Sequence, residues 1–191
     1  MTGHRAPVRT AKKVLLCGTF SVGKTSTLRD LLDKCALTGV RAALRGEPAR
    51  DCPLPLDLGQ GALTSTWLLG ELIRVESALA AQDDLDVMLC DGGPPDVLAH
   101  TRSAIGRGTV FDLCRAWQPT YDRVFWARPE PGHPAEPDAI RVLDERYRQE
   151  IDLALEAAFG MLNVTPIELP HTGSSRVEIM LRGLRGGSAG L

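Results

Sequence analysis

The 191-residue sequence has no long apolar run, little net charge and no segment that resembles an export signal. No stretch approaches the ~18 consecutive apolar residues that a membrane-spanning helix needs, and the N-terminal segment lacks the apolar core of a signal peptide. The formal net charge of −2 does not favour nucleic acid or an anionic membrane as a partner. These absences predict a soluble, cytoplasmic protein with no membrane partner.

The five cysteines have neither the spacing of a zinc site nor that of a disulfide framework. None forms a C-x-x-C pair, and their number is odd. Cys17 and Cys90 lie inside apolar runs, where cysteine packs as a small hydrophobic side chain. An odd count without a framework indicates a reducing compartment, which agrees with the cytoplasm.

The most informative motif of the sequence is a glycine-rich loop near the N-terminus. Residues 18–25, GTFSVGKT, match the G-x-x-x-x-G-K-[ST] pattern of a phosphate-binding P-loop, or Walker A motif. Residues 14–17 form an apolar run typical of a buried strand, and residues 25–35 carry leucines at helical spacing. A strand, a glycine loop and a helix in this order predict a site for a nucleoside triphosphate, expected to be ATP, with Mg²⁺.

Each residue type in this loop has a chemical purpose. Gly18 and Gly23 permit backbone conformations that a side chain would forbid, so that backbone N–H groups and the positive helix end face the phosphates. Lys24 is expected to reach the β- and γ-phosphates, and Thr25 to offer its hydroxyl to Mg²⁺. The residues predicted to bind the nucleotide are Gly18, Ser21, Val22, Gly23, Lys24, Thr25 and Ser26.

Strand and helix patterns alternate along the chain, and this alternation predicts a parallel sheet with helices on both faces. Right-handed crossovers restrict the possible topologies. The expected strands are 13–17, 40–44, 86–90, 121–127 and 164–169; the expected helices are 61–81, 138–159 and 174–184, with a broken helical region over 96–117. Residues 12–184 are expected to form one domain between flexible tails at 1–11 and 185–191.

Two carboxylates follow predicted strands, at the sheet edge where open α/β proteins bind their ligands. Asp91 is expected to hold Mg²⁺ or to accept a proton from the attacking hydroxyl. Glu47 is a second candidate for general base. The structural alternatives are a helix N-cap or a solvated turn residue for Asp91, and a surface ion pair with Arg50 for Glu47. Between the two, we expect Glu47 near the acceptor and Asp91 near Mg²⁺.

A proline-rich segment, residues 128–137, separates the fourth strand from the helix that follows it. Arg128 and Arg141 flank this segment, and either could close over the phosphates and stabilise the charge in transit. The structural alternative is a plain surface loop whose arginines are solvated. The sequence does not decide which of the two arginines would act.

A switch GTPase is disfavoured because two of its motifs are missing. No N-K-x-D segment is present to read guanine, and Pro94 stands where the D-x-x-G motif after the third strand requires glycine. The phosphate-binding loop is therefore expected to serve a kinase or an ATPase.

Three further segments resemble those of small P-loop kinases. EPAR at 47–50 resembles a segment of deoxynucleoside kinases. DGGPPDVLA at 91–99 is similar to the D-R-x-x-x-D-x-L-A segment of ATPases related to ribosylnicotinamide kinase. DAIR at 138–141 resembles the start of the lid helix in these ATPases. The resemblance covers residues 13–169. It implies a three-layer fold with a five-stranded parallel sheet of order 2-3-1-4-5, a mobile lid, and Glu47 as base or substrate anchor. One departure is clear, because Gly92 replaces an arginine that often contacts substrate or phosphate in these families.

The function predicted from the sequence is ATP- and Mg²⁺-dependent phosphoryl transfer to a hydroxyl of a small metabolite, preferably nucleoside-like. The alternative is an ATP-binding regulatory protein that hydrolyses slowly and acts through a protein partner. A nucleic-acid enzyme is disfavoured by the near-neutral charge and by the lack of a basic, aromatic-laced patch. The expected partner is a small-molecule acceptor, and a homodimer stays open.

Overall fold

The computed structural model describes residues 11–102, 104, 106–130, 132, 144–171 and 174–185. Five parallel strands form one sheet of order β2-β3-β1-β4-β5, which confirms the predicted order. The strands are β1 (Lys12–Cys17), β2 (Ala42–Arg45), β3 (Val87–Asp91), β4 (Arg123–Ala127) and β5 (Ile167–Leu169).

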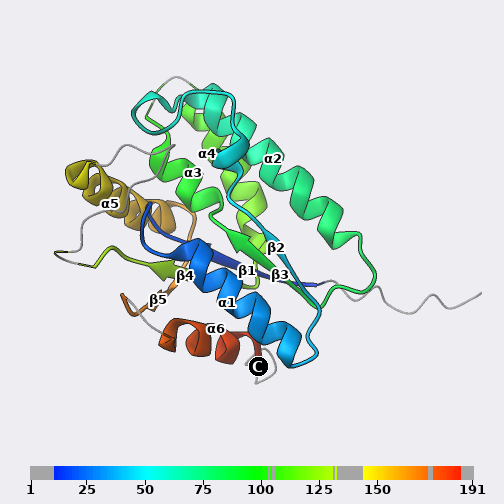
Figure 1. The fold of residues 1–191 in the computed structure, drawn as a ribbon. Coiled ribbons are helices and arrows are strands. Elements are labelled where there is room, and N and C mark those ends of the chain that lie inside the picture. Colours follow the sequence, from blue (N-terminus) through cyan, green and yellow to red (C-terminus); the bar gives the residue numbers. More distant parts are fainter. Residues whose placement is uncertain are drawn as a thin grey trace, which may run out of the picture.

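Helices cover both faces of the sheet and complete the predicted three layers (Figure 1). On one face lie α1 (Lys24–Leu37) and α6 (Ser175–Arg185), and on the other lie α2 (Ala62–Ala80), α3 (Pro94–His100), α4 (Arg107–Trp117) and α5 (Glu145–Met161). Short 3-10 turns, η1 (Pro48–Asp51), η2 (Asp57–Gly59) and η3 (Gln118–Thr120), lie in the connections. Among the described residues, no helix is both long and apolar enough to cross a membrane.

The central strand β1 supplies both halves of the core, because successive side chains of a strand point to opposite faces. Val14 and Leu16 pack with residues of α1 and α6, while Leu15 and Cys17 pack with residues of α5 on the other side. All four side chains are fully buried, and each fully buried leucine or valine contributes about 1.5–3 kcal/mol. The P-loop therefore follows directly on a strand that is buried on both faces.

Several boundaries differ from those predicted, each for a local reason. The expected strand at 121–127 begins at Arg123, because Tyr121 closes a 3-10 turn by donating its N–H to Gln118. The broken helical region at 96–117 is two helices, the second starting after Gly106 at a positive φ of 75°. In the helix expected at 138–159, the described part begins after Asp144, whose side chain caps it, and residues 138–143 lie outside the described residues.

Candidate nucleotide and acceptor site

The P-loop lies between the end of β1 and the start of α1, at the carboxyl edge of the sheet (Figure 1). Gly18 fits there only as glycine, because a Cβ would lie 2.4 Å from the carbonyl oxygen of Ala127 at the end of β4. Gly23 adopts a left-handed φ of 78° directly before α1. These two glycines let the loop turn tightly and bring the N-terminal end of a 14-residue helix to the phosphate position.

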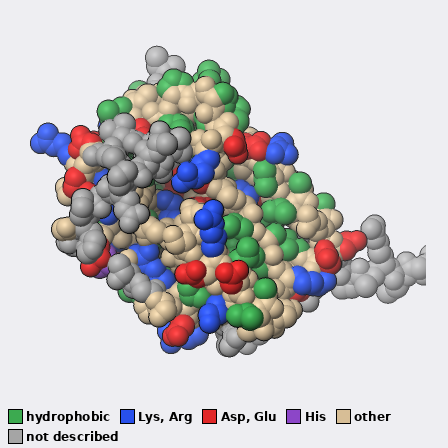
Figure 2. All heavy atoms as spheres, viewed as in Figure 1, with side chains coloured by type: hydrophobic (Ala, Val, Ile, Leu, Met, Phe, Trp, Pro, Cys, Tyr) green, Lys and Arg blue, Asp and Glu red, His purple; other side chains and the backbone are tan. Residues whose placement is uncertain are grey.

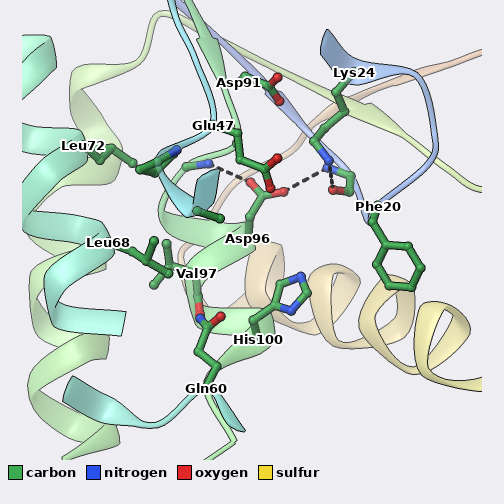
Figure 3. Close-up of a pocket in the computed structure, with 15 residues that line it drawn as sticks. Phe20, Lys24, Glu47, Gln60, Leu68, Leu72, Asp91, Asp96, Val97 and His100 are labelled. Atoms are coloured by element: carbon green, nitrogen blue, oxygen red, sulfur yellow. Dashed lines mark hydrogen bonds between the residues drawn. The ribbon is translucent and has the colours of Figure 1, made fainter. Parts of the chain in front are cut away.

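Lys24 extends back across the loop. Its Nζ donates to the carbonyl oxygens of Gly18, at 2.6 Å, and of Thr19, at 2.8 Å. The ammonium group is thus held inside the loop, at the border of the neighbouring cavity (Figure 3). An ammonium group at this place is the kind of cation that binds the β- and γ-phosphates in P-loop proteins.

Thr25 and Asp91 form the candidate Mg²⁺ position. The Thr25 hydroxyl donates to Oδ2 of Asp91 at 2.6 Å. Asp91 is fully buried, and its Oδ1 has no hydrogen-bond partner among the described residues. A buried carboxylate oxygen beside a hydroxyl suits a hard cation that binds oxygen at about 2.0–2.1 Å. These two residues therefore fit the predicted Mg²⁺.

The protein supplies only part of such a metal site. Within the described part of the chain, no group of three or more His, Cys, Asp and Glu side chains could hold a metal ion. Mg²⁺ is commonly held by one or two protein oxygens, together with phosphate oxygens and water. The Thr25–Asp91 pair is thus a metal position that would be completed by the nucleotide.

A cavity adjoins the P-loop and opens to solvent. Figure 3 shows Glu47 and Asp96 pointing into the same space, with Lys24 and Asp91 on the P-loop side. Leu68 of α2 and other apolar side chains form the walls. Clefts with apolar walls and a few polar groups are typical of small-molecule sites, and this one places a carboxylate beside the expected phosphates.

Glu47 reaches this cavity because β2 ends at the same edge of the sheet as β1 and β3. It precedes η1 in an extended conformation, as expected for a residue before proline. Its Oε2 lies 3.9 Å from Nε of Arg50, whose side chain is 53% exposed. Both predicted features are present together, because the glutamate lines the cavity and also lies near Arg50.

Asp96 is a site residue that sequence reasoning did not single out. Its Oδ1 accepts the N–H of Gly18 at 3.0 Å, and its Oδ2 accepts the N–H of Gly93 at 2.8 Å. Burial raises the pKa of the Asp96 carboxyl above its ordinary value, although Lys24 and these N–H donors oppose the rise. The only sequence signal was its place in the DGGPPDVLA segment, five residues after Asp91.

The floor of the cavity carries hydrogen-bonding groups. The imidazole of His100 points upward into the cavity (Figure 3), and its Nδ1 lies 3.0 Å from the hydroxyl of Tyr147 on α5. Gln60 also lines the cavity, with its Nε2 3.3 Å from Ser65 Oγ. Polar groups on a largely apolar floor can orient a ring that carries its own donors and acceptors.

Of the two candidate lid arginines, the structure describes only Arg128, which lies away from the cavity. Arg128 donates from Nε and Nη2 to Oδ2 of Asp152, at 3.1 and 2.9 Å, and lies 4.4 Å above the Trp126 ring. It is not among the described residues that line the cavity. Arg141 and most of the proline-rich segment lie outside the described residues. A role for Arg128 over the phosphates would require it to leave Asp152.

Comparisons with known proteins agree with this geometry. A family model described as "AAA domain" matches residues 13–176. A solved structure described as deoxyadenosine kinase from M. mycoides with bound dATP matches with a TM-score of 0.61, over 92% of this chain and 100% of that chain, at 14% sequence identity. No curated protein sequence matches the chain. The protein therefore belongs to this AAA domain family and has the fold of a P-loop NTPase of the deoxynucleoside kinase type.

Proposed function

We propose that the protein transfers the γ-phosphoryl group of ATP–Mg²⁺ to a hydroxyl of a small acceptor, preferably nucleoside-like, bound in the cavity. The observation that carries the proposal is the position of Glu47, which lines a cavity that Lys24 and Asp91 also line. A binding loop alone needs no carboxylate beside a cavity. Transfer to a hydroxyl does need one, to accept the proton that the attacking oxygen loses.

Each group of site residues has a separate role in the proposed reaction. The loop N–H groups and Lys24 bind the triphosphate, and Thr25 and Asp91 hold Mg²⁺. When bound, Mg²⁺ neutralises charge that builds on the β- and γ-phosphate oxygens. Glu47 accepts the acceptor's proton as its oxygen attacks in line. The apolar walls pack on the acceptor and exclude water, which would otherwise compete as the nucleophile.

The charge of the cavity restricts the acceptor. Three carboxylates line it, those of Glu47, Asp91 and Asp96, while Lys24 is the one lysine or arginine among the described lining residues. Lys24 is committed to the triphosphate. An acceptor that already carries a phosphate would meet uncompensated negative charge, and like charges placed together cost several kcal/mol. The acceptor is therefore proposed to be uncharged or cationic.

The face of the molecule in Figure 2 gives no reason to prefer a nucleic-acid substrate. On the face shown in Figure 2, basic and acidic side chains are interspersed and do not gather by sign. A backbone of closely spaced phosphates is bound by clustered lysines and arginines. This mixed surface supports a small acceptor over a polynucleotide.

The second candidate is a regulatory protein that binds ATP, hydrolyses it slowly and acts through a protein partner. Two observations favour it, namely the glycine at position 92 and the pairing of Arg128 with Asp152 away from the cavity. Both leave the described site with Lys24 as its single charge-stabilising cation. Such a protein would bind a partner according to its nucleotide state and would ignore small acceptors.

ATP turnover with a panel of acceptors distinguishes these functions. The panel contains nucleosides, sugars and amino alcohols, each tested beside its own monophosphate at equal concentration with Mg²⁺. We expect one uncharged or cationic class to accelerate turnover, by about tenfold or more over its monophosphate, because of the like-charge penalty. Preference for a monophosphate would contradict the charge argument. Slow turnover that ignores every acceptor while ATP still binds would favour the regulatory protein.

A further inference from the structure

Arg45, the last residue of β2, is buried against the backbone of Asp91, which belongs to the candidate Mg²⁺ position. Its side chain is only 2% exposed. Nη1 donates to the carbonyl oxygens of Asp91, at 2.6 Å, and of Gly46, at 3.0 Å, and Nη2 donates to the carbonyl oxygen of Gly92. One guanidinium therefore binds two consecutive carbonyls of the turn that carries Asp91. It also binds the backbone one residue before Glu47.

Glu76 of α2 fixes this guanidinium from the other side. Its carboxylate, which is completely buried, accepts Nε of Arg45 at 3.2 Å. It also accepts the Tyr121 hydroxyl at 2.8 Å and Trp117 Nε1 at 2.9 Å, and pairs with Lys13 Nζ at 2.6 Å. A buried charge is costly unless it is paired and hydrogen-bonded. The charges of Arg45 and Glu76 are both paired and hydrogen-bonded. The network joins β1, β2, α2, α4 and the residue that follows η3, and it leaves Arg45 little freedom.

The turn that carries Asp91 is held on one side by β1, where the Gly92 N–H donates to the carbonyl oxygen of Leu16 at 3.0 Å, and on the other side by Arg45. Gly92 has a positive φ of 69°, and the described contacts of the Asp91 carboxylate amount to one hydrogen bond, from Thr25. The direction of that carboxylate is thus set mainly by the backbone that bears it. Planar guanidinium groups can fix two acceptors at once, whereas an ammonium group acts as a point charge.

We propose that Arg45, fixed by Glu76, is a positioning residue for the metal site. It holds the Asp91–Gly92 turn so that the Asp91 carboxylate stays aimed at Thr25 and Mg²⁺. This inference rests on the proposed function for its importance to transfer, but it makes a separate statement about Mg²⁺ binding. The guanidinium does not touch nucleotide or acceptor, and it acts only through Asp91 and Gly92.

The test is the Mg²⁺ dependence of nucleotide affinity, measured by titrating a fluorescent ATP analogue at rising Mg²⁺ and in EDTA. We expect Arg45→Lys to raise the Mg²⁺ concentration for half-maximal effect about tenfold or more, as substitution of groups that orient metal ligands typically does. Affinity in EDTA should stay unchanged, because the P-loop is intact. Glu76→Asp keeps the charge but shortens its reach, and should shift the Mg²⁺ dependence in the same direction.

The matched control is Arg41→Lys, because Arg41 precedes the same strand and pairs with Asp86 at the surface, with its side chain 55% exposed. This variant should leave the affinity for the ATP analogue unchanged, both with Mg²⁺ and in EDTA. Folding is checked by circular dichroism, and if Arg45→Lys does not fold, the Glu76→Asp variant decides. If folded Arg45→Lys or folded Glu76→Asp shows the wild-type Mg²⁺ dependence, the proposal is overturned. It is also overturned if nucleotide affinity falls equally with Mg²⁺ and in EDTA. Because binding is measured, a wild type that transfers no phosphate would refute the proposed function and leave this test valid.

Discussion

Replacing Lys24 with alanine is expected to lower kcat for phosphoryl transfer by roughly a hundredfold to a thousandfold, the cost of removing one donor aimed at transition-state charge. The ammonium group lies within the loop, held by the carbonyls of Gly18 and Thr19, and borders the cavity. Charge on the phosphoryl oxygens grows during transfer, so that a fixed cation there stabilises the transition state more than bound ATP. The effect is measured by steady-state turnover at saturating ATP and acceptor.

The matched control is Lys34→Ala, which removes the same charge from the last turn of the same helix. Lys34 is exposed and far along α1 from the loop, so its loss should leave turnover unchanged. If Lys24→Ala kept full transfer, the assignment of the phosphate site would be wrong.

Replacing Glu47 with glutamine is expected to lower acceptor-dependent transfer by roughly a hundredfold to ten-thousandfold, the range for loss of a general base. Glutamine keeps the size of the side chain and its place in the cavity, but it cannot take the acceptor's proton at neutral pH. Affinity for ATP should not change, because the P-loop and the Thr25–Asp91 pair are separate from Glu47. The measurements are kcat with the best acceptor and the equilibrium affinity for ATP.

Two comparison variants make the Glu47 result specific. Glu71→Gln makes the same change on α2, where Glu71 forms an ion pair with Arg74, whose side chain is 67% exposed. This variant should have no effect on transfer. Asp91→Asn should instead weaken the response to Mg²⁺, because it removes the charge beside Thr25. A Glu47→Gln enzyme with near-normal transfer would exclude Glu47 as the base, and would leave Asp91 as the remaining carboxylate predicted for that role.

The parts of the site that could be predicted are those set by local sequence or by the ends of strands. The glycines and lysine of the P-loop lie within eight consecutive residues, and the structure builds the loop from them as expected. Asp91 and Glu47 follow strands, and parallel strands bring their carboxyl ends to one edge. Their convergence on one cavity follows from the sheet order alone.

The parts that could not be predicted depend on contacts between distant residues. Asp96 meets the N–H of Gly18 across 78 positions of sequence, and a polar residue early in a helix gives no sign of such a partner. Arg45 lies just beyond the strand expected at 40–44, yet it is the last, buried residue of β2. An arginine can be buried only where a partner such as Glu76 is brought to it, and that partner lies 31 residues away on another element.

Product analysis of one reaction tests the central claim most directly. The protein is mixed with ATP, Mg²⁺ and the acceptor that most accelerates turnover, and the products are followed by phosphorus NMR. The proposed function predicts ADP and a new phosphate ester of the acceptor in equal amounts, with little inorganic phosphate. ADP accompanied only by inorganic phosphate, whatever acceptor is present, would contradict it and show an ATPase that does not use the cavity for transfer.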